Sequence, residues 1–295
     1  MIPLSSIVQW SETAPWIGNK NIEQDLLICR ALCEIYNDGY LSEHLAFRGG
    51  TALGKLYLSP QPRYSEDIDL VQVCSEPIKE TIMRLQRVLS FLGHAAVKPK
   101  KYNNTLLFKV QPTEMGVGEI RLKVEINCKE HFSIFPAVRI PFSVSNEWYS
   151  GHCKILTYEL EELAGTKLRA LYQRRKGRDL FDLAQILTQF PDLDLDKVIL
   201  SYQKYLTFTA SHLPTYKEFQ LNLAGKLQDH EFLADTDAIL SPNTRYDPQA
   251  ASELVQSKLF SRMSIQGENA RSEPESFLST RPPRAHGPSR LRTLT

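Results

Sequence analysis

The chain has few cysteines, and they are not spaced for pairing. Its 295 residues include five cysteines, an odd number, and no two of them form a Cys-x-x-Cys motif. This usage argues against a disulfide framework and favours reduced thiols. We therefore expect a cytoplasmic protein.

Long apolar runs and a strong net charge are also missing. The longest apolar stretches are far shorter than a membrane span. The Met1-Ile-Pro-Leu start lacks the basic region and apolar core of a signal peptide, so we expect no membrane partner. A net charge of +1 predicts no partner from bulk electrostatics, and any nucleic-acid surface must be a local patch. The hydrophobic content of 42% is ordinary for a globular protein of one or two domains.

Two common nucleotide-binding motifs are absent, but a shorter glycine turn is present. The chain has neither Gly-x-x-x-x-Gly-Lys-Ser/Thr nor Gly-x-Gly-x-x-Gly. Instead, Gly49-Gly50-Thr51 separates an apolar run ending at Phe47 from a helical pattern that starts at Leu53. The glycines would let a ligand approach the backbone, Thr51 could cap the helix, and the helix N-terminus suits phosphate. Alone, this motif is more often a tight turn with a capping threonine.

Two carboxylates follow the glycine turn. The stretch from Asp67 to Val73 predicts a strand, with Asp67 and Asp69 on one face and apolar residues on the other. Adjacent carboxylates repel each other, and Asp is a poor strand former, so the pair is better explained as Mg²⁺ ligands than as structure. The alternative is a solvated strand end.

A third carboxylate lies on a later strand. The stretch from Glu119 to Asn127 alternates, with Lys123, Glu125 and Asn127 on the polar side. Glu125 would join the metal site if this strand lies beside the Asp67 strand. It could equally be an exposed residue paired with Lys123.

The first 150 residues predict a mixed α/β domain that ends near Ser150-Gly151. Its expected elements are helices over 21–36 and 76–92, a hairpin of strands over 105–111 and 119–127, and an edge strand over 138–144. Pro141 places that last strand at the edge, because proline cannot donate to a sheet ladder.

The chain is predicted to be helical from Thr157, which we expect to cap a helix, to about Phe260. Lys167 falls on the apolar stripe of the first of these helices. It would either extend along the helix edge to solvent or direct its charge at phosphates across a cleft. The residues 261–295 are rich in Ser, Pro and Arg and predict a disordered tail.

A basic run, Arg174 to Arg178, is interrupted by Gly177, which should break or bend the helix. The run could bind nucleic-acid phosphate or form a solvated helix end. Asp179 is suited to cap the next helix, and Asp182 could complete a capping box.

Three segments together resemble the AbiEii/AbiGii family of nucleotidyltransferase toxins. They are Arg48 to Leu53, Arg63 to Leu70, and Lys167 to Asp182. The resemblance extends from about Trp10 to Phe190 and implies an α+β fold. That fold has a DNA polymerase β-like nucleotidyltransferase domain with a small mixed sheet, followed by a helical domain.

The resemblance also implies roles for single residues. Arg48, Gly49, Gly50 and Thr51 would hold the triphosphate, Asp67 and Asp69 would bind metal with Ser65 beside them, Lys167 would contact phosphates, and Asp182 would be the acid of the last motif, with Asp179 as its competitor. The family implies Mg²⁺, an NTP substrate, a cognate antitoxin and a part in abortive phage infection. Some members transfer nucleotides to the 3′ end of tRNA.

Three functions remain open from the residues alone. They are an enzyme that modifies RNA, a nucleotidyltransferase acting on a protein hydroxyl or a small molecule, and a non-catalytic nucleotide-binding module. The intact Asp67/Asp69 pair argues against the third, and the basic run favours RNA over a small molecule.

Overall fold

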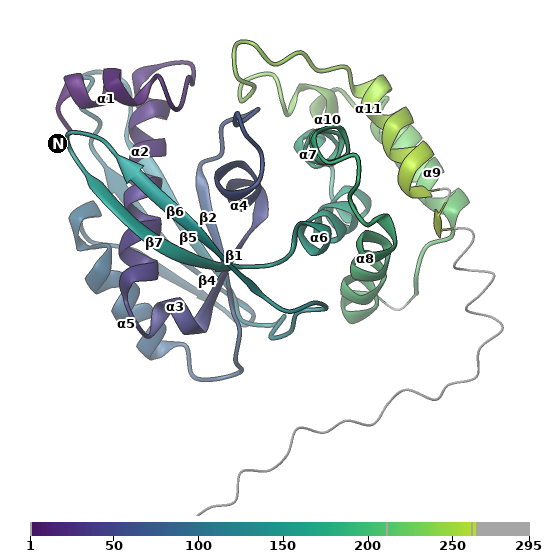
Figure 1. Cartoon of the computed structure of the whole chain (residues 1–295), viewed down its shortest axis with the longest axis horizontal. Coiled ribbons are helices and arrows are strands. Elements are labelled where there is room, and N and C mark those ends of the chain that lie inside the picture. The colour runs from purple at the N-terminus through teal and green to yellow at the C-terminus, as the bar shows by residue number, and fades with distance from the viewer. Residues whose placement is uncertain (1, 211, 261, 264–295) are drawn as a thin grey trace, which may run out of the picture.

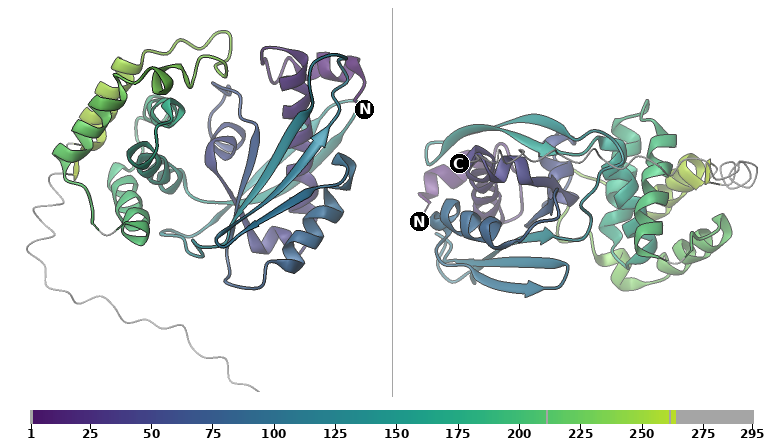
Figure 2. Two further views of the ribbon diagram at one scale, coloured as in Figure 1. Left: turned by 180° about the vertical axis from the view of Figure 1, so that it is seen from behind. Right: turned by 90° about the horizontal axis from the view of Figure 1, so that it is seen from below.

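A computed structural model describes residues 2–210, 212–260 and 262–263. A mixed β-sheet fills the N-terminal part, and a layered group of helices follows it (Figures 1 and 2). The strands are β1 (Leu45–Arg48), β2 (Asp67–Gln72), β3 (Ala96–Lys100), β4 (Asn103–Val110), β5 (Ile120–Asn127), β6 (Val138–Ser145) and β7 (Ser150–Thr157).

The seven strands form one sheet in the order β3-β4-β5-β2-β1-β7-β6. The central strand β2 pairs antiparallel with β1 and parallel with β5. The hairpins β3–β4, β4–β5 and β6–β7 are antiparallel, and β1 pairs with β7 in parallel. This topology places β2 beside both the glycine turn after β1 and the alternating strand β5.

The helices fall into two groups. The sheet region holds α1 (Leu4–Trp10), α2 (Asn19–Asn37), α3 (Leu41–His44), α4 (Gly49–Leu56), α5 (Lys79–Val88) and η1 (Ser90–Leu92). The C-terminal region holds α6 (Leu160–Gln173), α7 (Gly177–Gln189), α8 (Leu195–Thr209), α9 (Tyr216–Lys226), α10 (His230–Ala234), α11 (Pro248–Val255) and the π-helical turn η2 (Gln256–Phe260).

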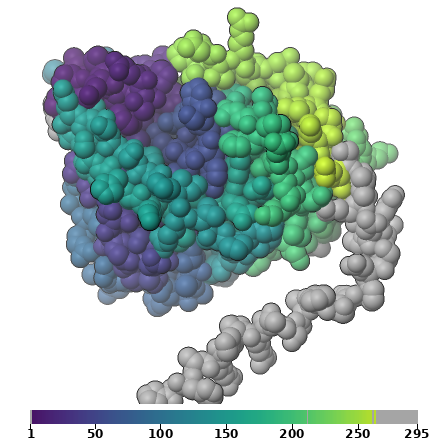
Figure 3. All heavy atoms as spheres, viewed as in Figure 1, coloured from purple at the N-terminus to yellow at the C-terminus, as the bar shows by residue number. Residues whose placement is uncertain are grey.

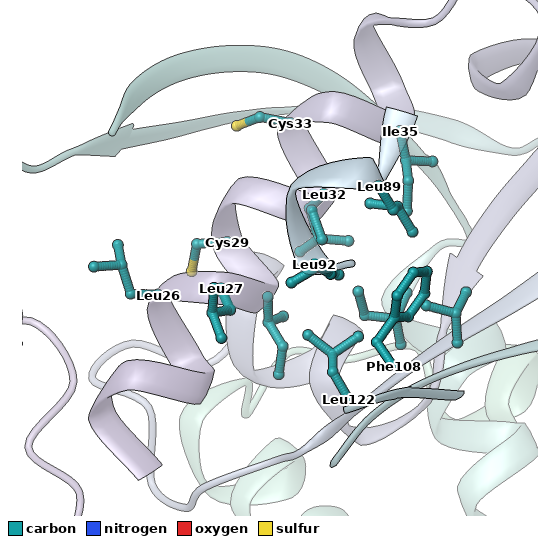
Figure 4. Close-up of a cluster of buried hydrophobic side chains, with 14 of the residues drawn as sticks. Leu26, Leu27, Cys29, Leu32, Cys33, Ile35, Leu89, Leu92, Phe108 and Leu122 are labelled. Carbon is teal, nitrogen blue, oxygen red and sulfur yellow. The ribbon is translucent and has the colours of Figure 1, made fainter. Parts of the chain in front are cut away.

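A hydrophobic core lies under one face of the sheet. The helix α2 contributes Leu26, Leu32 and Ile35, which pack near Phe108 and Leu122 of β4 and β5 (Figure 4). Burial of these apolar side chains removes them from water, which is the main favourable contribution to folding. Ile68 and Leu70 of β2 belong to this core, so Asp67 and Asp69, which alternate with them, face the opposite side.

The helical region has its own core, which reaches the other face of the sheet. Ala46 of β1 and Val71 of β2 belong to this second cluster, together with side chains of α6, α7 and α8. The helix α4 lies between the sheet and α6 (Figure 1). The helical region therefore packs on the same face of the sheet as the acidic residues of β2.

A segment near the end of the chain returns to the sheet region. Between α10 and α11, Ile239 O accepts a hydrogen bond from Tyr64 N, and Ser241 N donates to Pro62 O. In the space-filling view (Figure 3), this yellow-green segment reaches from the helical region towards the N-terminal helices. We call residues 239–241 the returning segment.

The predicted fold class is confirmed, with a larger sheet than expected. The helix over 21–36, the β4–β5 hairpin and the edge position of β6 were all predicted. The strands β3 and β7 were not predicted, because Ala96–Lys100 is exposed and contains a proline, and Ser150–Thr157 was assigned to the region after the domain end. The sheet therefore ends at Thr157 rather than near Ser150.

Two predicted helix caps are wrong. Thr157 ends β7, and its hydroxyl donates to Phe47 O over 2.7 Å, while α6 begins after Glu159. Asp179 does not cap a helix either, because α7 already begins at Gly177. The break before Gly177 and the helical character up to Phe260 were predicted.

The predicted tail over residues 261–295 lies, apart from residues 262–263, outside the described residues. Within the described part of the chain, no helix combines the length and apolar character needed to cross a bilayer.

Candidate functional site

Asp67 and Asp69 occupy the start of the central strand β2. Alternation along the strand puts both carboxylates on the face that meets the helical region, as predicted, while Ile68 and Leu70 are buried on the other face. The Asp69 carboxylate makes no hydrogen bond or ion pair with a side chain or backbone group of another described residue. A partly buried carboxylate without a partner is costly, so this position suits a cation.

The glycine turn lies directly against this strand. Arg48 ends β1 opposite Asp69, and Gly49 follows in the left-handed region with φ of 83°. A Cβ atom on Gly49 would overlap the Asp69 carboxylate, and one on Gly50 would overlap the Arg63 guanidinium. The two glycines are therefore required by the side chains of the site as well as by the turn.

Thr51 positions its neighbours instead of capping α4, as the sequence had suggested. It is buried, and its hydroxyl bonds with Ser65 Oγ at 2.7 Å and donates to the backbone oxygen of Asp67. The helix has no side-chain cap. Thr51 thus ties the glycine turn to the loop that leads into β2.

Glu125 joins the carboxylate pair from the neighbouring strand. The parallel register places it beside Asp69 and places Lys123 beside Asp67. Lys123 Nζ lies 3.0 Å from Asp67 Oδ2 and 3.5 Å from Glu125 Oε1. Both predicted environments of Glu125 are therefore present, since it lies next to the pair and also pairs with Lys123.

The electrostatic environment disfavours charge on the carboxylate pair. Burial raises the pKa of Asp67 to about 6, although the Lys123 ammonium opposes that shift. Burial also raises the pKa of Asp69, with Arg48 opposing the rise and Glu125 adding to it. A bound cation would reverse both effects by favouring the charged forms.

A cation cluster, built from α6, the start of α7 and the loop before β2, faces the carboxylates. Lys167 of α6 is buried, and its Nζ lies 2.7 Å from Asp182 Oδ2 and 3.2 Å from Asp179 Oδ1. Arg63 forms a two-pronged pair with Asp182 at 2.7 and 2.8 Å, and Arg174 does the same with Asp179 at 2.6 and 2.7 Å. Three cations thus share two carboxylates, which leaves one positive charge in excess.

The two carboxylates of this cluster remain ionised. Burial would raise the pKa of Asp182, but Arg63 and Lys167 outweigh it and lower the pKa to about 2. Burial likewise opposes the lowered pKa of Asp179, which results from Lys167 and Arg174. Both acids therefore hold cations in place, and Lys167 is paired inside the protein instead of extending to solvent.

The carboxylate pair and the cation cluster line one polar pocket of about 150 Å³. Its lining comprises Gly50, Arg63, Ser65, Glu66, Asp67, Asp69, Lys123, Glu125, Lys167, Arg174 and Arg178. A pocket with acids on one wall and cations on the other suits a triphosphate that carries a divalent metal.

Arg48 does not line this pocket. Its guanidinium pairs with Glu130 Oε2 at 2.5 Å, and Arg169 of α6 pairs with the other oxygen of the same carboxylate at 2.5 Å. The link joins β1 to the helical region behind the pocket. Asp179, Asp182, Gly49 and Thr51 also lie outside the lining, where they position groups that belong to it.

Sequence reasoning missed the roles of Arg63, Lys123 and Glu130. Arg63 was noted only as part of a motif, and its partner Asp182 lies 119 residues away. The alternation that pointed to Glu125 also placed Lys123 on the same face, and that was the available signal. Glu130 lies in a loop with no pattern that marks it.

The basic run after α6 is largely neutralised. Arg174 pairs with Asp179, Arg175 pairs with Asp229 at 3.3 Å, and Lys176 and Arg178 both pair with Asp235. Arg174 and Arg178 still reach the pocket. The run therefore serves the pocket more than it offers a basic surface for a long nucleic acid.

The donor set fits Mg²⁺ only together with a substrate. Among the described residues, no three acidic, histidine or cysteine side chains form a ready-made metal site. Asp67 and Asp69 provide hard oxygen donors, and Mg²⁺ in NTP-dependent sites usually takes one or two carboxylates plus phosphate oxygens. The residues present are consistent with that arrangement.

Comparison with solved structures supports the fold. MenT4, a nucleotidyltransferase toxin from Mycobacterium tuberculosis, matches with a TM-score of 0.66 and 16% identity over 91% of this chain and 93% of its own. JHP933 from Helicobacter pylori matches with a TM-score of 0.53 and 19% identity over 87% and 98%. A putative nucleotidyltransferase from the same organism gives 0.52 and 18% over 86% and 99%.

The sequence comparison is more specific. No curated protein matches the chain. The family model described as nucleotidyl transferase AbiEii toxin, type IV TA system, matches residues 30–256, which is most of the chain. The chain therefore belongs to the AbiEii family of nucleotidyltransferase toxins of type IV toxin–antitoxin systems.

Proposed function

We propose that the protein transfers a nucleoside monophosphate from an NTP to the 3′ end of an RNA, with tRNA as the expected acceptor, and requires Mg²⁺. Such a transfer would serve growth arrest or abortive infection, under control of a cognate antitoxin. The observation that carries the proposal is a single pocket in which the unpaired Asp69 and its neighbour Asp67 face Lys167, Arg174 and Arg178.

The two walls of the pocket would bind different parts of the substrate complex. Asp67 and Asp69 would hold Mg²⁺, which when bound would neutralise phosphate charge and activate the attacking hydroxyl. Lys167, Arg174 and Arg178 would bind the phosphate oxygens and offset the charge that develops on the transferred group. The N-terminus of α4 lies beside the same wall and favours anions.

Asp179 and Asp182 act as positioning residues in this scheme. Each binds Lys167 and one arginine, which fixes the direction of the cations before a substrate arrives. Fixed charges need no rearrangement during the reaction, and this is where most electrostatic catalysis originates. In this proposal both Asp179 and Asp182 have that role, because each pairs with Lys167 and with one arginine.

The proposal is tested by incubating the purified protein with each labelled NTP, Mg²⁺, and total cell RNA or total cell protein. We expect the label in the small RNA fraction, with release of pyrophosphate. Label in protein would support transfer to a side-chain hydroxyl instead. Pyrophosphate release without labelled RNA or protein would indicate a small-molecule acceptor.

The positioning of Lys167 leads to a prediction for Lys167→Met. Transfer should fall by at least about tenfold, because a preorganised charge next to the phosphates is lost. The fold should survive, since Asp182 keeps Arg63 and Asp179 keeps Arg174. Transfer assays and thermal denaturation of the same preparation check both parts, and full activity would remove Lys167 from the site.

The raised pKa of Asp67 predicts that Mg²⁺ binding depends on pH. At pH 5 the carboxyl is mostly protonated and at pH 7.5 mostly charged, because its pKa is about 6. The rise in melting temperature caused by MgCl₂ should therefore be larger at pH 7.5.

Without metal, the contribution of Asp67 to stability depends on pH in the opposite direction. A folded pKa above the unfolded value favours folding at low pH, and this contribution is lost as the pH rises through about 6. Asp67→Asn should show neither the metal effect nor this contribution. An equal Mg²⁺ shift at both pH values would contradict the assignment of Asp67 as a ligand.

A further inference from the structure

Two exposed aromatic side chains lie away from the pocket, with lysines between and beside them. Tyr102, in the β3–β4 turn, is 47% exposed, and Phe208, in the last turn of α8, is 44% exposed. Lys129 Nζ lies 5.5 Å from the Tyr102 ring centre and 5.3 Å from that of Phe208, and Lys101 Nζ lies 5.0 Å from Tyr102. We call Lys101, Tyr102, Lys129 and Phe208 the aromatic–lysine patch.

The patch is held firmly by both regions of the protein. Tyr102 O accepts a hydrogen bond from Cys128 N at 2.9 Å, which fixes the hairpin turn to the end of β5. The Phe132 ring lies 5.0 Å from Phe208 and 4.9 Å from the buried Tyr205. The Phe208 ring thus extends a packed aromatic row, and the Tyr102 ring is held by its turn, so both are positioned for contact with a flat ligand.

No carboxylate among the described residues neutralises the lysines of the patch. Among the described residues, neither Lys101 nor Lys129 forms an ion pair, whereas Arg174, Arg175 and Lys176 all do. Lys98 and Lys100 on the edge strand β3 are unpaired as well, but charged side chains there are explained by protection of a sheet edge. Edge protection does not explain an exposed Tyr102 or the position of Lys129.

A polar track leads from the patch to the pocket. On β5 the pocket residues Lys123 and Glu125 are followed on the same face by Asn127, about 13 Å along the strand at ~3.3 Å per residue. Asn103 of β4 lies opposite Asn127, and its buried Oδ1 has no hydrogen-bond partner among the described residues. Polar side chains thus continue from the pocket towards the patch on this face of β4 and β5.

We propose that the aromatic–lysine patch binds the single-stranded end of the acceptor RNA and directs it along β5 into the pocket. Exposed rings stack on any nucleobase, and unpaired lysines beside them neutralise backbone phosphates, which is how proteins hold single strands without reading sequence. The proposal rests on the proposed function, because it places the acceptor of that same transfer.

The test compares two double variants of the full chain. Lys101→Ala/Tyr102→Ala removes half of the patch. Tyr216→Ala/Lys217→Ala removes another exposed tyrosine, 39% exposed, and its neighbouring lysine from α9 as the matched control. Fluorescence anisotropy with a labelled single-stranded 12-nucleotide RNA measures binding. We expect the patch variant to bind at least tenfold more weakly and the control to stay within twofold of the parent.

Phe208→Ala provides a second variant on another element. It should also weaken RNA binding about tenfold but leave the salt dependence unchanged, whereas Lys101→Ala should reduce the slope of log affinity against log salt by about 0.7. The affinity for NTP, measured separately, should be the same in all variants. Thermal denaturation verifies that each variant is folded.

The outcomes separate this inference from the proposed function. Three results would overturn the proposal that the patch binds RNA. They are equal RNA binding by the parent and the folded patch variants, an equal loss of binding in the α9 control, and no RNA binding by the parent. Patch-dependent RNA binding without labelled RNA in the transfer assay upholds the patch and overturns RNA as the acceptor. Labelled RNA with full activity of the patch variants overturns the patch and leaves the proposed function standing.

Discussion

Asp69→Asn should abolish nucleotidyl transfer and stabilise the metal-free protein at neutral pH. The variant keeps the shape of the side chain but removes the charge that we propose binds the metal, which should cost at least about a hundredfold in rate. It should melt at the same or a higher temperature, since burial raises the pKa of Asp69 and no described residue pairs with it. Labelled-NTP transfer and thermal denaturation in EDTA measure the two effects.

The control for this variant is Glu119→Gln, which also replaces a carboxylate by an amide but lies just before β5 and outside the pocket. Glu119 pairs with Lys109 at 3.3 Å and should affect neither activity nor stability noticeably. Glu125→Gln then asks whether the third carboxylate is needed. An active Asp69→Asn protein, or one that melts several degrees lower in EDTA, would mean that Asp69 is structural.

Arg63→Met should be the most destabilising single change at the site. Arg63 is buried and donates to both oxygens of Asp182 and to Tyr64 O. Its loss leaves Asp182 with Lys167 as its only ion-pair partner among the described residues, and breaking a buried pair from one side costs about 3 kcal/mol or more. Urea unfolding of parent and variant measures the change in the free energy of unfolding.

Two further variants show whether charge is the cause. Arg87→Met removes an arginine that is 66% exposed and pairs with Asp38. The free energy of unfolding of this variant should therefore hardly differ from that of the parent. Arg63→Met/Asp182→Leu removes both charges and should recover part of the lost stability, although not activity. If the double variant is less stable than Arg63→Met, the cost arises from packing and not from an unpaired carboxylate.

The parts of the site that depend on local sequence were predictable. The alternation that places Asp67, Asp69, Lys123 and Glu125 on polar faces needs only the two-residue period of a strand. The strand–turn–helix arrangement at Gly49 follows from glycine and apolar patterns in nine residues. The inward position of Lys167 follows from the helical period.

The rest depends on contacts between distant segments. Neither the partners of Lys167 nor the pairing of Arg63 with Asp182 leaves a periodic signal, because each joins residues from different elements. Asp179 was predicted to cap a helix because it follows Gly177, where acidic caps are common. In the structure it is buried and pairs with Lys167 and Arg174 instead. The strand β7 was missed because Ser150-Gly151 resembles a domain end.

The returning segment has a consequence for how the toxin is made. It pairs with Pro62 and Tyr64, on either side of Arg63, so the loop that supplies Arg63 and Ser65 to the pocket is held by residues 239–241. A chain still on the ribosome can complete the sheet and the carboxylate pair well before these residues emerge. The loop that carries Arg63 and Ser65 would then be fixed only after residues 239–241 have emerged, so a shorter nascent chain would hold the carboxylate pair without a completed pocket.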